Sequence, residues 1–169
     1  MAARNIARIK FLFVLLAASA CSLPLQAQHD DWNRFRGPGG AGISDSSKVA
    51  SEWSAQKNIQ WKAEIPGPGS SSPIVPGDKV VITCDTAYGV DPKAPGNAPD
   101  LKRHLLCFDR TTGKELWRDA VDSVVDEDEF QGFVTDHGFA SSTPVSDTDQ
   151  VFGFFGKSGL VAWDLQGNR

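Results

Sequence analysis

The chain has 169 residues, the usual size of one domain, and 40% of them are hydrophobic and 22% charged, as in globular proteins. Its formal net charge is −4, and the first 27 residues carry three basic residues and no acidic one, so the remainder is more acidic still. Nucleic-acid binding needs clustered Lys and Arg to neutralise phosphates, so we expect no nucleic-acid partner.

Residues 1–27 have the pattern of an export signal, because a basic head precedes an apolar run that is too short to span a bilayer. Two cleavage sites compete. The triplets at 18–20 and 25–27 suit an ordinary signal peptidase, whereas AASAC resembles the lipobox of bacterial lipoproteins, with Cys21 as the lipidated residue and Ala18 where Leu is usual. We expect an exported chain, periplasmic or extracellular, that contacts a membrane only through a lipid on Cys21.

After a polar, Gly-rich lead-in at 28–58, short runs of strand-forming residues alternate with Pro- and Gly-rich turns. Apolar and polar residues alternate in NIQWKAEI, which predicts a half-buried strand over 59–65. Further strands are expected within 74–84, 104–110, 114–118, 141–156 and 159–168. No segment has a long apolar period of 3.6 residues, so we predict an all-β chain with little helix.

The chain repeats itself. SSSPIVPGDKVVI aligns with SSTPVSDTDQVFG, and HLLCFDRTTG aligns with GLVAWDLQG, which places Asp109 on Asp164. Upstream, Trp61 corresponds to Trp117, 56 residues later, and the Pro/Gly-rich segment 85–103 reads as an insertion of about 15 to 19 residues. Without it the period is roughly 40 residues, which is typical of a four-stranded propeller blade.

The stretch CFDRTTGKELW, residues 107–117, has a physical role in such a unit. Gly113 gives the backbone freedom for a tight turn, and Asp109 and Thr112 can accept hydrogen bonds from backbone amides there. Trp117 brings a large apolar ring for burial against a neighbouring unit. We interpret these residues, with Trp61 and Asp164 at the repeated positions, as a structural fastener between units.

The pattern C-x-D-x-x-T-G-K-x-x-W resembles the tryptophan-docking motif of the quinoprotein (pyrroloquinoline quinone, PQQ) β-propeller repeat, with Cys107 in place of its usual Ala. The stretches SSSPIV, DKVVIT and GFFGKSGLVAWD are similar to other strands of those repeats. The resemblance covers most of residues 32–169. It implies an incomplete β-propeller over 59–169, with about one and a half four-stranded antiparallel blades, from the N-terminal part of a longer wheel.

That class contains both PQQ-dependent alcohol dehydrogenases and non-enzymatic scaffolds, among them the propeller lipoprotein of the outer-membrane barrel-assembly machinery. The chain lacks the adjacent Cys pair and the clustered Glu, Asn and Asp calcium ligands of several such dehydrogenases. The resemblance therefore favours an exported, non-catalytic binding or assembly scaffold with a protein or cell-envelope partner and no cofactor. The alternative is the N-terminal part of a PQQ-dependent dehydrogenase, which would use PQQ and calcium.

The remaining candidate residues keep two interpretations each, and none is predicted to be catalytic. His137 precedes the first strand of a unit and is a candidate ligand contact, with Asp136 placed to orient its imidazole; otherwise it is a loop histidine bonded to Asp136 or the backbone. Cys84 and Cys107 lie on strands expected to be neighbours, so they either form a disulfide or fill the core as two small side chains.

Two groups of polar residues suggest chemistry that their context does not support. The serines that begin each repeat recur with its period, which favours hydrogen bonds at strand ends over a nucleophile. The acidic stretch 121–133 could hold calcium, but its spacing does not match an EF-hand loop, so we interpret it as solvated and predict no metal site.

Overall fold

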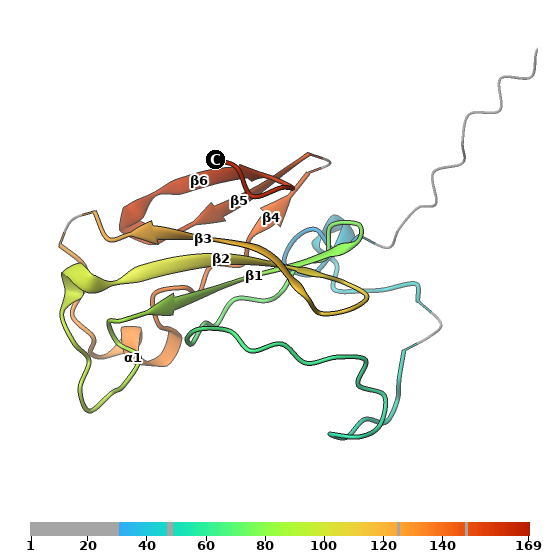
Figure 1. Ribbon diagram of the computed structural model, residues 1–169. Coiled ribbons are helices and arrows are strands. Elements are labelled where there is room, and N and C mark those ends of the chain that lie inside the picture. Colours follow the sequence, from blue (N-terminus) through green and yellow to red (C-terminus); the bar gives the residue numbers. More distant parts are fainter. Residues whose placement is uncertain (1–30, 47–48, 125, 148) are drawn as a thin grey trace, which may run out of the picture.

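The computed structural model describes residues 31–46, 49–124, 126–147 and 149–169, and these form two three-stranded antiparallel sheets, in the orders β1-β2-β3 and β4-β5-β6 (Figure 1). The all-β prediction is confirmed. The predicted export signal and Cys21 lie outside the described residues. Within the described part of the chain, no helix combines the length and apolar character needed to cross a membrane.

The first sheet consists of three eight-residue strands, β1 (Lys79–Thr86), β2 (Lys102–Asp109) and β3 (Glu115–Asp122). β-Branched and aromatic residues in these runs favour an extended backbone. Lys79 pairs with Asp109 at one end of the β1–β2 ladder and Thr86 with Lys102 at the other. An irregularity between Cys107 and Phe108 shifts the β2–β3 register just before the turn.

The second sheet is shorter and consists of β4 (Val145–Ser146), β5 (Gln150–Phe154) and β6 (Leu160–Asp164). It repeats the pairing of the first sheet. Val145 pairs with Phe152, as Ile74 bridges to Val81, in keeping with the sequence alignment of the two units. The β5–β6 ladder repeats the β1–β2 ladder in the same way, with the pairs Val151–Trp163 and Val80–Phe108.

Most of the hydrophobic core lies between the two sheets, where the second sheet covers one face of the first (Figure 1). The first sheet contributes Ile74, Val81, Leu105, Cys107 and Val121, and the second contributes Val151, Phe155 and Trp163. The opposite face of the first sheet, here called the front face, carries a second cluster formed by Val80, Ile82, Cys84, Leu106 and Phe108. Both faces of this sheet are therefore apolar, as in a sheet packed between two neighbours.

Among the described residues there are one short α-helix, α1 (Phe133–His137), and three single-turn 3₁₀-helices, η1 (Pro38–Gly40), η2 (Ala98–Asp100) and η3 (Gly156–Ser158). The inserted segment between β1 and β2 is anchored by aromatic packing. Tyr88 lies 5.2 Å from Phe139 between ring centroids, and its hydroxyl accepts the amide N–H of Phe130 at 2.9 Å. The insertion is thereby attached to the loop that precedes β4.

The strand predicted over 59–65 does not form in the described chain: these residues have no regular secondary structure and pair with no strand. Strand formation needs a neighbouring ladder, and alternation of apolar residues does not supply one. Ile59 is 41% exposed and Ile65 39% exposed as a result. The strand expected at the start of the first unit is likewise reduced to the single bridge from Ile74, so the first sheet has three strands where a four-stranded blade was predicted, and the second has the roughly three strands that were expected.

Candidate functional site

The turn between β2 and β3 is organised by the carboxylate of Asp109. Its Oδ1 accepts the amide N–H groups of Thr111 at 3.1 Å and Thr112 at 2.7 Å, and the Thr112 hydroxyl at 2.7 Å. The amide of Gly113, whose φ is +72°, donates to the Asp109 carbonyl at 2.9 Å and closes the turn. The Thr112 hydrogen bonds hold the pKa of Asp109 below its ordinary value.

The indole of Trp61 docks on this turn. Its ring lies so close over Gly113 that a Cβ there would be 2.5 Å from the ring, and its Nε1–H donates to the Arg110 carbonyl at 2.9 Å. Glycine is therefore required twice, for the positive φ and for the indole contact.

Trp117 makes the same contacts on the second sheet. A Cβ on Gly167 would be 2.7 Å from the Trp117 ring, and the indole Nε1–H donates to the Leu165 carbonyl at 3.1 Å. The turn that receives it is held by Asp164, whose Oδ1 accepts the amides of Gln166 and Asn168, each at 2.9 Å. The residues predicted as a fastener thus make equivalent contacts at the same positions in two successive units.

A cleft of about 310 Å³ lies beside α1, between the loop that precedes β4 and the β5–β6 turn. Its lining includes His137, Phe133 and Phe154, together with the ion-paired residues Arg103 and Lys157. Phe133 is 75% exposed and Phe154 is 54% exposed, so the cleft has two aromatic side chains largely open to solvent. Exposed aromatic side chains are among the residues enriched at protein–protein interfaces.

The charges around the cleft are committed to structural ion pairs. The guanidinium of Arg103 binds both oxygens of Glu127, at 2.9 and 2.7 Å, and also donates to the Phe139 carbonyl at 3.0 Å. Arg103 also holds the pKa of Glu127 below its ordinary value, chiefly through its hydrogen bonds to the carboxylate. Lys157 pairs with Asp128 at 2.8 Å. These pairs fasten the acidic loop to β2 and η3.

His137 faces the cleft without the partner expected from the sequence. Among the described residues, its imidazole makes no hydrogen bond to Asp136 or to any other side chain; instead it packs on Phe133, with ring centroids 4.4 Å apart. Asp136 is exposed at the same short helix. His137 therefore offers ring nitrogens to an incoming group, but no neighbouring carboxylate orients it as a general base.

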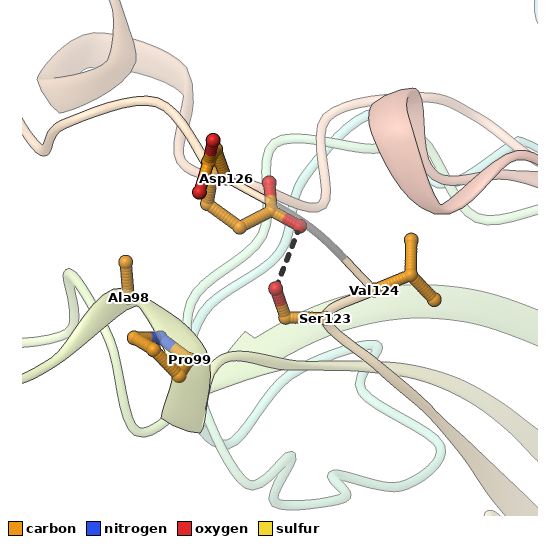
Figure 2. A pocket seen from close by; sticks show the side chains of 6 residues that line it. Ala98, Pro99, Ser123, Val124 and Asp126 are labelled. Carbon is orange, nitrogen blue, oxygen red and sulfur yellow. Dashed lines mark hydrogen bonds between the residues drawn. The ribbon is translucent and has the colours of Figure 1, made fainter.

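A second pocket shares Glu127 with this cleft and is otherwise lined by Ala98, Pro99, Ser123, Val124 and Asp126 (Figure 2). The Ser123 hydroxyl, labelled in Figure 2, donates to the Glu127 carboxylate at 3.1 Å. This carboxylate is already bound by Arg103. Within the described residues, no group of three or more His, Cys, Asp or Glu side chains could hold a metal ion, in this pocket or elsewhere.

Asp85 is a buried carboxylate that sequence reasoning missed. It is fully buried on β1, its Oδ1 accepts the Phe139 amide at 3.1 Å, and its Oδ2 has no partner among the described residues. Burial raises the pKa of Asp85 above its ordinary value. Asp85 and Arg103 are cross-strand neighbours, and each holds one of the contacts that close the loop over this end of the sheet. The sequence signal that could have revealed this pair of residues is a charged side chain at a core-facing position in each of the two strands.

The two cysteines are free, so the disulfide alternative is not formed. Cys107 pairs with Val81 in the ladder, three positions from Cys84, and an odd separation places the two side chains on opposite faces of the sheet. Burial raises the pKa of Cys84 to about 11 and that of Cys107 to about 12, so both stay protonated thiols at neutral pH. They act as small core side chains.

The repeated stretches hydrogen-bond to the middle of β1 and to each other, the latter through the Ser72 amide, which donates to the Thr143 hydroxyl at 3.0 Å. The Ser71 hydroxyl accepts the Thr83 amide at 3.3 Å, and the Ser142 carbonyl accepts the Thr83 hydroxyl at 3.5 Å. Through these hydrogen bonds, Ser71 and Ser142 each connect the start of a unit to the middle of β1.

No protein-family model matches the chain, and no curated protein matches it either.

Proposed function

We propose that the two sheets are successive blades of an exported, PQQ-like repeat β-propeller that acts as a non-catalytic binding or assembly scaffold in the cell envelope. The observation that carries this proposal is the paired docking of Trp61 on Gly113 and Trp117 on Gly167. Two indoles 56 residues apart make the same hydrogen bond and the same glycine contact on successive units, as expected of radially repeated blades.

The distribution of polar groups supports a scaffold. The side chains that looked chemically suggestive serve turns, strand ends and ion pairs, while the most exposed feature of the cleft is aromatic. Aromatic side chains are enriched at the energetic centres of protein interfaces. We therefore place the contact with a protein partner at the cleft of Phe133 and His137.

Site-specific photo-crosslinking in exporting cells tests this proposal. A photoreactive residue in place of Phe133 is expected to capture a cell-envelope protein of defined mass, and the same residue in place of Phe35, which is 58% exposed outside the cleft, is expected to capture none. Equal capture at both positions, or none at Phe133, contradicts the placement of the site. Dye reduction by the purified chain with PQQ, Ca²⁺ and alcohols contradicts the non-catalytic assignment.

A further inference from the structure

A further pocket, of about 400 Å³, lies where the starts of the two repeated units meet. Among the described residues its lining consists of Phe35, Ser70, Ser72, Ser141 and Thr143. The alignment of the two units places Ser70 on Ser141 and Ser72 on Thr143. Both units therefore supply an equivalent pair of hydroxyl groups to the same pocket.

The structural role of the repeated serines does not account for these hydroxyl groups. Ser71 bonds to the backbone of Thr83, but the hydroxyls of three lining residues make no hydrogen bond with the described chain: Ser70, Ser72 and Ser141. The Thr143 hydroxyl accepts the Ser72 amide at 3.0 Å and still has its own proton to donate. The pocket thus has four hydroxyl groups available to a ligand.

The remaining lining residue, Phe35, is carried by the lead-in, which bridges the two units. Trp32 exchanges backbone hydrogen bonds with Val75 of the first unit, at 3.1 and 2.8 Å. The Asn33 carbonyl accepts the amide of Ser146 on β4, in the second unit, at 2.9 Å. The backbone just before Phe35 is therefore fixed to both of the units that form the pocket.

The ring of Phe35 is held in place without being buried. It is 58% exposed, and it follows Arg34, whose carbonyl accepts the Gly37 amide at 2.9 Å and closes a turn. Arg36 takes a φ of +63° in this turn, a conformation that few side chains adopt, and its guanidinium carbon lies over the ring, 5.7 Å from the centroid. Burial in the core therefore does not explain why an aromatic ring stands at this pocket.

An aromatic ring beside several hydroxyl groups is chemically suited to a sugar. A pyranose presents C–H groups on its faces, which pack on the electron-rich face of an aromatic ring, and hydroxyls around its rim. Serine and threonine hydroxyls both donate and accept, so they can pair with sugar hydroxyls in either direction. A charged ligand would need a charged partner on leaving water, and the described lining has no charged side chain.

We propose that this pocket binds a neutral sugar residue of a glycan, which stacks on Phe35 and hydrogen-bonds to the hydroxyls of the two repeated stretches. Its volume lies within the range of about 300 to 1,000 Å³ that is usual for small-molecule sites. The inference goes beyond the scaffold function and does not depend on it, because the pocket and the cleft of Phe133 have separate linings.

Nuclear magnetic resonance titration of the purified chain is the first measurement, with cellotriose, maltotriose and chitotriose as separate probes. We expect at least one of them to bind with a dissociation constant of about 1 mM, since the site is open and holds one sugar. Saturation of the protein's aromatic protons should be transferred most strongly to the C–H protons of that sugar. Failure of all three to bind at about ten times this concentration overturns the proposal, as does tighter binding of an acidic galacturonic acid trimer.

Variants in the ring test the position of the site. Phe35→Ala is expected to weaken binding of that sugar by at least about tenfold, because an aromatic side chain at the centre of a site supplies much of its affinity. The control Trp53→Ala removes an aromatic ring that is 71% exposed outside the pocket, and it should leave binding unchanged. Equal effects of the two variants would mean that the sugar binds exposed aromatic rings without selecting this pocket.

Variants in the hydroxyl groups test the polar half of the site. Ser70→Ala/Ser141→Ala is expected to lose binding to a similar extent with an unchanged thermal midpoint, because these hydroxyls make no bond within the described chain. Ser51→Ala, at an exposed serine outside the pocket, is the control and should bind normally. Binding that survives the double variant contradicts the proposed site.

Photo-crosslinking separates this inference from the scaffold function. A photoreactive residue in place of Phe35 that captures a protein would assign the pocket to a protein partner and overturn the sugar site. Absence of sugar binding, with capture of a protein at Phe133 retained, would overturn the sugar site alone. Sugar binding with no capture at Phe133 would support the sugar site and contradict the protein contact at the cleft.

Discussion

At the residue scale, the positions expected to tolerate the fewest substitutions are the glycines and aspartates of the two turns, where the backbone conformation and the contacts admit few other side chains. Gly113 and Gly167 each combine a positive φ with an indole in van der Waals contact, and Asp109 and Asp164 each hold a turn through one carboxylate. These residues form a recognisable sequence motif because each turn admits few alternative residue types, so we assign them a structural role.

Gly113→Ala tests the indole contact. We expect it to lower the free energy of unfolding by about 3 kcal/mol, since a methyl group would need a strained φ and would also displace Trp61. Gly77→Ala is the control: φ is also positive, but nothing lies within 4 Å of its Cβ position, so we expect a loss of about 1 kcal/mol. Urea denaturation measures both, and equal losses would show that docking contributes nothing.

Asp85 gives a prediction with a definite sign. Its pKa is raised in the folded state, so folding binds a proton, and stability falls as pH rises from about 4, the pKa of an unfolded Asp, through the raised pKa. Asp85→Asn cannot ionise and is expected to lose this decline while keeping an acceptor for the Phe139 amide. Urea midpoints from pH 4 to 8 measure the difference; parallel curves for the two proteins would refute it.

At the element scale, the loop between β3 and β4 is fixed by one buried ion pair and one exposed pair. Arg103 and Glu127 are 3% and 2% exposed in their side chains, whereas Lys157 and Asp128 are 42% and 66% exposed. A buried charge that loses its partner is strongly unfavourable, but an exposed pair is screened by water and salt. The acidic loop expected to be solvated is thus attached mainly through a single carboxylate.

Glu127→Gln should therefore cost far more than Asp128→Asn. We expect a loss of about 3 kcal/mol for the buried position and less than about 0.5 kcal/mol for the exposed one. Hydrogen exchange of the amides from 126 to 139 should also accelerate in Glu127→Gln alone. Equal stability of the two variants would mean that Arg103 finds another acceptor.

At the scale of the whole molecule, the two sheets share one core and should unfold together. Val151→Ala removes two methyl groups from a fully buried position between the sheets, so we expect a loss of about 2 kcal/mol. Val145→Ala, at a position on β4 that is 39% exposed, should lose less than about 1 kcal/mol. Amide exchange in β1–β3 and β5–β6 should report a single transition, and two separate transitions would show independent sheets.

The local features of this protein were readable from its sequence. Strand runs, the Asp109 and Asp164 turns and the alignment of the two units depend on alternation, turn chemistry and spacing, which act over a few residues. The prediction of an all-β chain follows from them.

Features that join distant segments were decided by the tertiary structure. It placed Cys84 and Cys107 on opposite faces, brought Glu127 to Arg103 and left 59–65 without a ladder. A hydrogen-bonded strand, a buried ion pair and a covered sheet face each need a partner far along the chain. Local pattern specifies what a segment can pair with, whereas register and packing between distant segments determine whether that partner is there.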